Sequence, residues 1–388
     1  MQSLSLTAVG LLLWLSSSAG WPQDQSATFT ATLADGASAD DAKARALFEL
    51  GAVQADLNEL DTAERTFLRG IEHLTEAHSE FSPLLLDPYR GLAQVYVQSG
   101  RYAEALTVLE QAQHISQRNY GLFNVEQTVI LDEMSAVYTA AGDTRNAQEI
   151  QRKRLNIGLR RYGEDNLELV PYRYHLAEYY ELSRMHARAR AQYEDVIEIQ
   201  ESQLDRYSGD LLKPLRELVR LDILSGDSSS ARHHLLEILT RGTEIAAVER
   251  ARSLAVLGDW ALTNGQLEIG LSRYREADAV LVTDADSQTV KLFSIPTLIN
   301  FIPPPSPVDW TGGSKPYQWG TISAELEISA QGRARNVRIV AAIPPGLMDA
   351  DYKRRLMESY FRPRLVAGEP AATPHVRFTH QFRYFQPD

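Results

Sequence analysis

Two histidines and a glutamate in the stretch HLTEAH (73–78) are residue types that could bind zinc or move a proton. A zinc-binding helix of the metalloprotease kind needs its histidines four positions apart, because that spacing places both on one face. His73 and His78 are five positions apart, which separates them by about 140° around a helix, with Glu76 between them. We therefore expect no metal site here.

The other candidates for chemistry are isolated side chains. His233 and His234 are adjacent and face different directions, which indicates surface or packing residues. His380 falls on the apolar side of a predicted strand and is better interpreted as a core histidine than as a catalytic one. The stretch SGDSSSA (225–231) is typical of a turn between helices. Since no GxSxG, P-loop or dinucleotide-binding glycine pattern occurs, we predict no catalytic residue, no metal and no cofactor.

Composition predicts two modules with different surfaces. The chain has 388 residues, 44% of them hydrophobic, which is enough to bury a sizeable core. Residues 1–310 hold 28 Lys and Arg against 44 Asp and Glu, a net charge of −16, whereas residues 311–388 hold 11 against 7, a net charge of +4. The acidic body argues against nucleic-acid binding. The absence of cysteine excludes disulfides, thiolate metal sites, cysteine nucleophiles and a lipoprotein anchor.

The opening MQSLSLTAVGLLLWLSSSAGWPQD indicates export. An apolar run (6–15) precedes small residues (17–20) that offer the spacing of a signal-peptide cleavage site. The run is shorter than the roughly 20 apolar residues that span a bilayer. We predict a signal peptide at 1–20, a flexible mature N-terminus at 21–39, a periplasmic location, and no integral membrane span after signal removal. The alternative is an inner-membrane anchor made by an uncleaved N-terminal segment.

The body of the chain repeats with a period of 42 residues. Six dipeptides align in steps of 42, 42, 42, 42 and 39 residues: Leu50-Gly51, Leu92-Ala93, Met134-Ser135, Leu176-Ala177, Leu218-Val219 and Leu257-Gly258. Twelve residues after each second position stands a small residue that lets two helices approach closely: Ala63, Ala105, Ala147, Ala189, Ala231 and Gly270. Sixteen residues after each second position the side chain is large, except at Gln151. Glycine-containing turns such as QSGRYAEA (98–105) separate the halves of a repeat, so each repeat is predicted to be a helical hairpin.

This spacing resembles the tetratricopeptide repeat, whose pattern of small and aromatic positions is matched by LAQVYVQSGRYAEALTVLEQA (92–112). The 42-residue period and the link RRYGEDNLELV (160–170) are similar to the kinesin-light-chain type of this repeat. The resemblance covers about six repeats (40–282) and implies a mainly α chain built as a solenoid of helical hairpins. Three positions depart from the pattern: Gln54, Gln151 and Asp222.

The resemblance also implies where partners bind. Such arrays hold an extended peptide or a partner helix on a concave face built from the first helix of each repeat. Eight side chains are predicted to line that groove: Arg90, Gln94, Asp132, Tyr174, Glu178, Glu181, Arg216 and Arg220. The alternative is that they are ordinary solvated positions of the helices.

A proline-rich connector (283–315) ends the helical period, because the five prolines of FSIPTLINFIPPPSPVDW (293–310) favour extended backbone. Apolar residues such as Phe293 and Ile299 indicate that the connector packs on the protein. Whether it occupies the repeat groove stays open.

Beyond the connector, alternation of polar and apolar residues predicts a small α+β domain (316–388). Its expected elements are two strands, TISAELEIS (321–329) and NVRIVAA (336–342), then a helix, LMDADYKRRLMESYF (347–361), and a last strand (376–385). The helix should end before Pro363 and present one buried stripe: Met348, Tyr352, Leu356 and Tyr360. The last strand should present one apolar face: Val376, Phe378, Phe382 and Tyr384.

This ββαβ order resembles the TonB carboxy-terminal domain. The matching elements are a hairpin turning at Gly332, Pro344-Pro345, Phe361-Arg362-Pro363, Gly368-Glu369-Pro370 and the final VRFTHQFRYF. The resemblance implies a periplasmic domain that binds partners by strand pairing, with four last-strand residues at the partner: Arg377, Thr379, Gln381 and Arg383. The family's energy transducers also have a transmembrane helix with a functional histidine, whereas no histidine precedes His73 here.

The sequence thus predicts an exported, non-enzymatic scaffold of the bacterial cell envelope. Its expected partners are proteins or peptides of the envelope, held by the repeat groove and by the TonB-like domain. The alternative is a TonB-type component of energised outer-membrane transport.

Overall fold

The structure is a computed structural model that describes residues 5–7, 39–205, 207–241, 245–284, 290–305 and 318–384. It divides into two compact units, an N-terminal unit (Leu11–Tyr179) and a C-terminal unit (Met1–Gly10 with Tyr180–Asp388). Most of the predicted signal peptide and mature N-terminus lie outside the described residues, as do residues 306–317, which include the end of the predicted connector.

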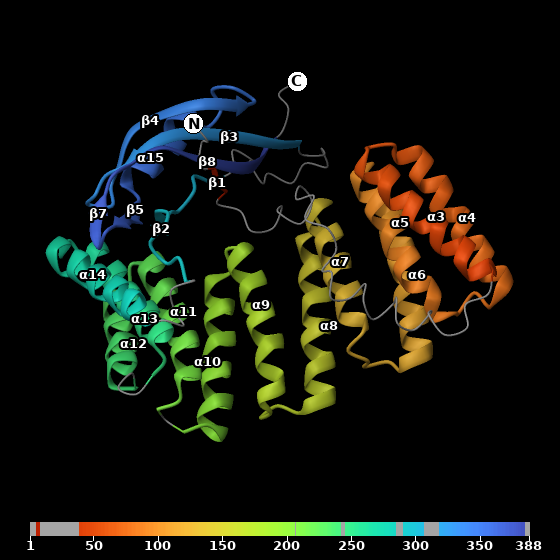
Figure 1. Ribbon diagram of the computed structural model, residues 1–388, viewed down its shortest axis with the longest axis horizontal. Coiled ribbons are helices and arrows are strands. Elements are labelled where there is room, and N and C mark those ends of the chain that lie inside the picture. The colour runs from red at the N-terminus through yellow and green to blue at the C-terminus, as the bar shows by residue number, and fades with distance from the viewer. Residues whose placement is uncertain are drawn as a thin grey trace. The chain divides into compact units, whose positions relative to one another are not determined.

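The N-terminal unit consists of consecutive helix pairs, drawn in red to yellow-green in Figure 1. Its helices are α3 (Ala39–Asp56), α4 (Leu60–Ala77), α5 (Leu86–Gln98), α6 (Tyr102–Tyr120), α7 (Gln127–Ala140), α8 (Thr144–Tyr162) and most of α9 (Val170–Leu182). Two short 3-10 turns, η1 (Pro83–Leu85) and η2 (Leu167–Leu169), precede α5 and α9.

The C-terminal unit continues the series and then changes architecture. Its repeat helices are α10 (His186–Gln203), α11 (Leu212–Ser225), α12 (Ser228–Arg241), α13 (Ala247–Thr263) and α14 (Leu267–Thr283), with the turn η3 (Gly209–Leu211) before α11. The helices from α3 to α14 therefore form six successive pairs in the chain. This confirms the predicted fold class: a mainly helical chain of tandem hairpins followed by a small sheet-containing region.

The small residues of the repeat pattern lie where two helices meet. The alanines predicted to allow close approach have no exposed surface: Ala63, Ala105, Ala147, Ala189 and Ala231. In the last pair, a Cβ added at Gly258 of α13 would lie 2.3 Å from a ring carbon of Tyr274 in α14. Tyr274, the large residue sixteen positions after Gly258, therefore fills the space beside this glycine.

The turn inside each hairpin uses a left-handed residue. Gly100, Gly142, Gly226 and Gly265 have φ between 71° and 80°, a region in which glycine carries no steric penalty. The fourth repeat has Arg184 at this position with φ 58°. The same backbone turn thus forms there without glycine.

The links between repeats share a polar cap that our sequence analysis missed. Ser82, Asn124, Asn166 and Ser208 recur at intervals of 42 residues. Each side-chain oxygen accepts a hydrogen bond from a backbone N–H two or three residues later, at the start of the following helical turn. This cap fixes where the first helix of the next repeat begins.

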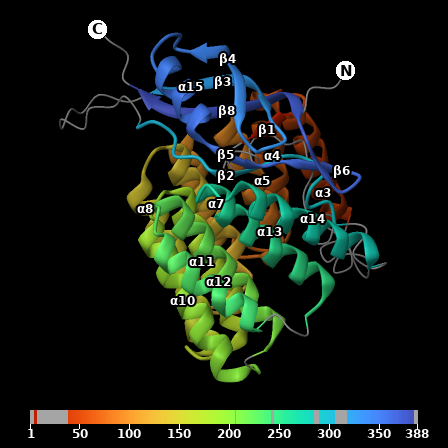
Figure 2. The same ribbon diagram turned by 90° about the vertical axis from the view of Figure 1, so that its left-hand side faces the viewer.

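The C-terminal region contains a four-stranded sheet in the order β1-β8-β3-β4. The strands are β1 (Ser5–Thr7), β3 (Gln318–Ile328), β4 (Ala334–Ile343) and β8 (Thr373–Tyr384), and β8 lies between β1 and β3 in Figure 2. The pairs β3–β4 and β3–β8 are antiparallel, whereas β1 runs parallel to β8. Alternate residues of β3 are buried beneath α15 (Asp349–Glu358), as predicted: Ile322, Ala324, Leu326 and Ile328.

Two details of this region differ from the sequence prediction. The helix α15 ends at Glu358, well before Pro363, because Ser359 is extended and Tyr360 already belongs to a strand. Besides β1, four short strands were also missed: β2 (Thr297–Asn300), β5 (Tyr360–Arg362), β6 (Arg364–Val366) and β7 (Glu369–Ala371). They form the two antiparallel pairs β2–β5 and β6–β7.

The described part of the connector packs on the last hairpin, as its apolar residues indicated. Phe293 and Ile299 are buried in one cluster with residues of α13 and α14, and Tyr360 and Leu365 pack against it. The backbone N–H of Leu365 donates to the carbonyl of Phe293 at 3.0 Å. Within the C-terminal unit, the sheet-containing region is therefore joined to α13 and α14 through a shared core.

Candidate partner-binding face

The eight side chains predicted to line a groove differ in exposure. Gln94 and Glu178 are exposed, whereas Arg216 is buried and the other five are half-buried. Five of the eight contact polar side chains of a neighbouring first helix, four of them in ion pairs and Asp132 through a histidine: Arg90, Asp132, Glu181, Arg216 and Arg220.

In the N-terminal unit, these pairs link α5 to α7 and α7 to α9. The Arg90 guanidinium donates to both carboxylate oxygens of Glu133, at 2.6 to 3.0 Å, and to Asp87 at 2.9 Å. The Asp132 carboxylate lies 2.9 Å from Nε2 of His175 and accepts from Arg154 at 3.1 Å. Both links between first helices join residues 43 positions apart, about one repeat.

The C-terminal unit continues the pattern with different spacing. Arg220 of α11 donates to Glu181, at the end of α9, and to Glu217 at 2.8 Å. Arg216 of α11 donates to Glu249 of α13 at 2.7 Å. We call the residues of these links between first helices, in both units, the paired face. Each unit thus holds its first helices together through charged side chains as well as apolar contacts.

Partial burial gives the paired face its electrostatic character. Burial raises the pKa of the Glu133 carboxyl, and the Arg90 guanidinium acts in the opposite direction. Charge-assisted bidentate pairs of this kind fix side-chain geometry as well as contributing energy. The face can offer ordered carboxylates and guanidiniums to a polar partner, but its use as a groove stays a prediction.

One departure from the repeat pattern has a structural explanation. Asp222 stands where other repeats have an aromatic residue, and its side chain is fully buried. It accepts hydrogen bonds from Arg190 of α10 and from Nδ1 of His234, the latter at 2.8 Å. His233 is mostly exposed, so the two adjacent histidines face different environments, as predicted.

The four last-strand candidates lie on β8, at positions that alternate with its buried residues. Arg377 is exposed, whereas Thr379 and Gln381 are half-buried. The Thr379 hydroxyl is hydrogen bonded to that of Ser323 on β3 at 2.8 Å, and Arg383 pairs with Trp319 in the register of the strands. The edge of β8 away from β3 is taken by β1, with Ser5 opposite Arg377 and Thr7 opposite Thr379.

A buried ion pair that our sequence analysis missed joins the small domain to the last hairpin. Two nitrogens of the Arg362 guanidinium, Nε and Nη2, donate to the Asp259 carboxylate at 3.0 and 2.5 Å. The Tyr274 hydroxyl donates to the same carboxylate at 2.8 Å. Burial would lower the pKa of Arg362, and the carboxylate of Asp259 reverses this. The sequence analysis singled out Arg362 only within the element Phe361-Arg362-Pro363, because its partner is 103 residues away in the sequence.

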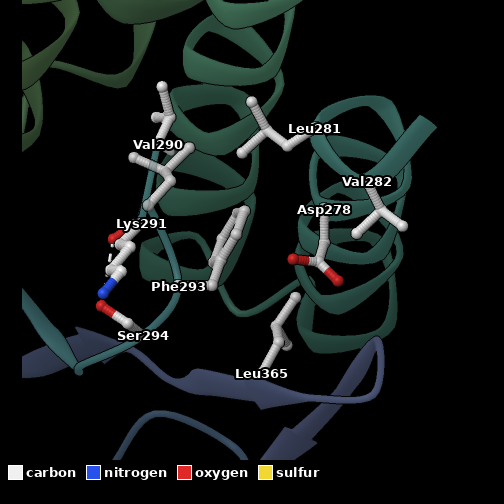
Figure 3. Close-up of a pocket in the computed structure, with 9 residues that line it drawn as sticks. Asp278, Leu281, Val282, Val290, Lys291, Phe293, Ser294 and Leu365 are labelled. Carbon is white, nitrogen blue, oxygen red and sulfur yellow. Dashed lines mark hydrogen bonds between the residues drawn. The ribbon is translucent and has the colours of Figure 1, made fainter. Parts of the chain in front are cut away.

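A cavity of about 370 Å³ lies beside this junction, between α14 and the connector (Figure 3). Asp278 and Leu281 of α14 line one side, and Val290, Phe293 and Leu365 line the other. Burial raises the pKa of the Asp278 carboxyl. Lys291 and Ser294 also line the cavity, and Asp278 is the single carboxylate among the residues of its lining.

The histidines that were considered for chemistry contact other side chains of the protein. Among the described side chains, no group of three or more His, Cys, Asp or Glu is arranged to hold a metal ion. Nε2 of His78 lies 2.5 Å from the Asp41 carboxylate of α3. His380 is buried and stacks on Tyr352, with ring centroids 5.8 Å apart, and burial together with Arg184 lowers its pKa to about 4. His78 is thus bound to a carboxylate and His380 is packed in the core of the small domain. Within the described ranges, no helix is both long enough and apolar enough to cross a membrane.

Comparison with known proteins supports the repeat assignment. The tetratricopeptide-repeat family model matches residues 42–118, and a search of curated proteins finds no match. A putative kinesin light chain from Podosopora anserina with nearly identical TPR-like repeats is 21% identical, covering 52% of this chain and 96% of that one, with a TM-score of 0.40.

Two further solved structures are similar to this chain. BtubC (BKLC) from P. vanneervenii is 15% identical over 66% of this chain and 99% of that one, with a TM-score of 0.40. A Rap protein complexed with competence and sporulation factor is 12% identical over 63% of this chain and 66% of that one, with a TM-score of 0.33. The matched residues 42–118 correspond to α3 through α6, so the chain contains tetratricopeptide repeats, followed by a small sheet-containing C-terminal region.

Proposed function

We propose that this protein is an exported scaffold of the bacterial cell envelope that binds other proteins through its repeats and through the edge of β8. A tetratricopeptide-repeat fold suggests a protein–protein interaction scaffold, since stacked hairpins expose long surfaces without a catalytic centre. The observation that carries the proposal is that β8 has two partner strands, β3 on one side and Ser5–Thr7 on the other. The N–H and C=O groups of this edge are therefore able to accept a strand from another chain.

Cleavage of the predicted signal peptide would expose this edge of β8. Residues 5–7 fall inside segment 1–20, so cleavage of that segment would remove β1. The main-chain groups of β8 near Arg377 and Thr379 would then be open to a partner strand. The resemblance of residues 316–388 to the TonB carboxy-terminal domain supports the same use of the last strand.

A strand-exchange experiment tests the proposal. A fluorescent peptide with the sequence of residues 2–10 is titrated into protein that comprises residues 21–388, and binding is followed by anisotropy. We expect saturable binding. A matched peptide with N-methylated backbone amides, which keeps every side chain but loses N–H donors, should not bind.

The same peptides connect the edge to biological partners. Proteins captured from envelope extract by residues 21–388 should be displaced by the unmodified peptide and retained with the N-methylated one. If neither peptide binds, or if neither changes the amount of envelope protein that is captured, β8 is not a strand acceptor. The function must then be sought in the repeats alone.

A further inference from the structure

The outer face of α8 carries a stripe of cations unlike the rest of the acidic body. Four of its side chains fall within about a 100° sector and extend roughly 22 Å along the helix. We call these residues the basic face: Arg145, Arg152, Lys153 and Arg160. All four are exposed, with Glu149 as the one acidic residue in the same sector.

The basic face differs from the paired face in having no ionic partners. None of its four side chains forms an ion pair or a hydrogen bond within the part of the chain that the structure describes. By contrast, Arg154, on the other side of α8, is paired with Asp132. Glu149 is the one carboxylate in this sector of α8, so the repulsion among the four cations is only partly compensated.

The repeat itself shows that these charges are not part of the consensus. The corresponding positions one repeat earlier, on α6, are Ala103, Glu110, Gln111 and Arg118. One repeat later, on α10, they are Ala187, Glu194, Asp195 and Ser202. At three of the four sites both neighbouring repeats therefore have neutral or acidic residues, whereas Arg160 has a basic counterpart in Arg118. Neither neighbouring repeat has the cluster of four cations.

A loop with two exposed apolar side chains lies beside the basic face. Leu122 and Phe123, in the link between α6 and α7, are 67% and 44% exposed. The Arg160 guanidinium lies 5.8 Å from the Phe123 ring centroid, which connects the loop to α8. At the equivalent positions of the next link stand Glu164 and Asp165. We call Leu122 and Phe123 the apolar loop.

The apolar loop is held from inside. The buried Asn124 side chain donates to the carbonyl of Gly121 at 2.6 Å, and it accepts from the backbone N–H of Gln127 at 2.9 Å. The Ser116 hydroxyl donates to the same side chain at 3.0 Å. Leu122 and Phe123 are thus presented to solvent by an ordered turn.

We propose that the basic face and the apolar loop together dock this protein on an anionic membrane surface. Cations that approach acidic lipid head groups and apolar side chains that enter the interface reinforce each other at such a surface. An acidic protein segment would pair with the cations but would leave the two apolar side chains without a role. The combination on one helix and its adjoining loop therefore favours lipid.

Vesicle co-sedimentation tests the proposal with full-length protein. Every protein compared carries Leu11→Glu and Leu13→Glu, so that the apolar run near the N-terminus does not itself bind lipid. We expect binding to phosphatidylcholine vesicles that contain about 30% phosphatidylglycerol, no binding to pure phosphatidylcholine, and weakening by added salt.

Charge reversals locate the surface. Arg152→Glu with Lys153→Glu should weaken binding to anionic vesicles about tenfold or more. The matched control, Arg65→Glu with Arg69→Glu on α4, changes net charge by the same amount at exposed positions of another second helix and should change binding by less than about twofold. Leu122→Ser with Phe123→Ser should weaken binding at unchanged net charge.

Two results would overturn the proposal. One is equal loss in the two charge-reversed proteins, which would mean a general charge effect. The other is that the protein does not bind vesicles but binds soluble polyglutamate, and that only the Arg152→Glu, Lys153→Glu variant loses this binding. That result would identify an acidic protein segment as the ligand class.

Discussion

The paired face and the basic face use charge in opposite ways. On the first helices, Arg90 and Arg216 each contact an oppositely charged residue of the next first helix, and Asp132 contacts His175. On the outer side of α8, four cations have no such contact within the described residues. Both sets belong to helices of the same hairpin type, so the fold alone does not decide whether a charge is paired.

The difference separates charges that hold the repeats together from charges that are available to bind a ligand. Charges that recur at about one repeat and meet each other contribute to stacking, and removing one leaves its partner partly buried and unpaired. Charges that appear in one repeat only, without partners, can be replaced without loss of folding energy. Stability measurements should therefore distinguish the two faces.

The largest effect is expected at the most buried pair, Arg362 with Asp259. Arg362→Met leaves the buried Asp259 carboxylate of α13 without its guanidinium partner and should lower the free energy of unfolding by about 3–5 kcal/mol. Adding Asp259→Leu removes the orphaned charge, so the double variant should recover much of that loss. Urea denaturation of the three proteins measures both quantities.

The recovery is the informative part of this comparison. If the double variant is as unstable as Arg362→Met, the loss comes from apolar packing of the guanidinium stem and not from an unpaired carboxylate.

A pH dependence of comparable size is expected from His380, which is buried in the small domain with its pKa lowered to about 4. Between the usual value near 6.5 and about 4, the unfolded chain binds a proton that the folded one does not. Stability should thus be complete above pH 6.5 and fall by about 3 kcal/mol as the pH drops to 4.

His380→Phe keeps a ring against Tyr352 but cannot titrate, so its stability should lack this part of the pH dependence. Urea denaturation of both proteins from pH 7 to pH 4 gives the difference. Parallel curves would show that the histidine is not the group responsible.

The hairpins could be predicted from the sequence because each depends on residues close together in the chain. Gly258 and Tyr274, for example, are only 16 positions apart and pack against each other within one hairpin. The buried stripe of β3 followed in the same way from alternation. The four caps also recur at 42-residue intervals, but serine and asparagine share these positions, so no single residue type marks them: Ser82, Asn124, Asn166 and Ser208.

The contacts between repeats could not be predicted in the same way. Arg90 was placed in a groove because its helix position faces that way, but its pairing with Glu133 depends on the rotation between successive hairpins. That rotation is a property of packing, not of period. The pairs β2–β5 and β6–β7 were missed for a related reason, since three or four residues are too few to show alternation.

An intermediate effect is expected on the paired face. Arg90→Met should cost about 1–2 kcal/mol, since the pair is bidentate but Glu133 keeps some contact with water. Glu133→Gln and the double variant complete a cycle that isolates the coupling between the two side chains. A coupling near zero in urea denaturation would mean that the paired face does not hold the repeats together.

The smallest effect is expected on the basic face. Arg152→Glu with Lys153→Glu should change the free energy of unfolding by no more than about 0.5 kcal/mol, because both side chains are exposed and without ionic partners among the described residues. The reversal at Lys153 places a like charge four positions from Glu149, but the double change also removes repulsion among the cations, so the two contributions oppose each other. Urea denaturation beside the Arg65→Glu, Arg69→Glu control measures the change. A loss above about 1 kcal/mol would make the basic face part of the architecture, and its lipid binding would then have to be measured again in variants that leave stability intact.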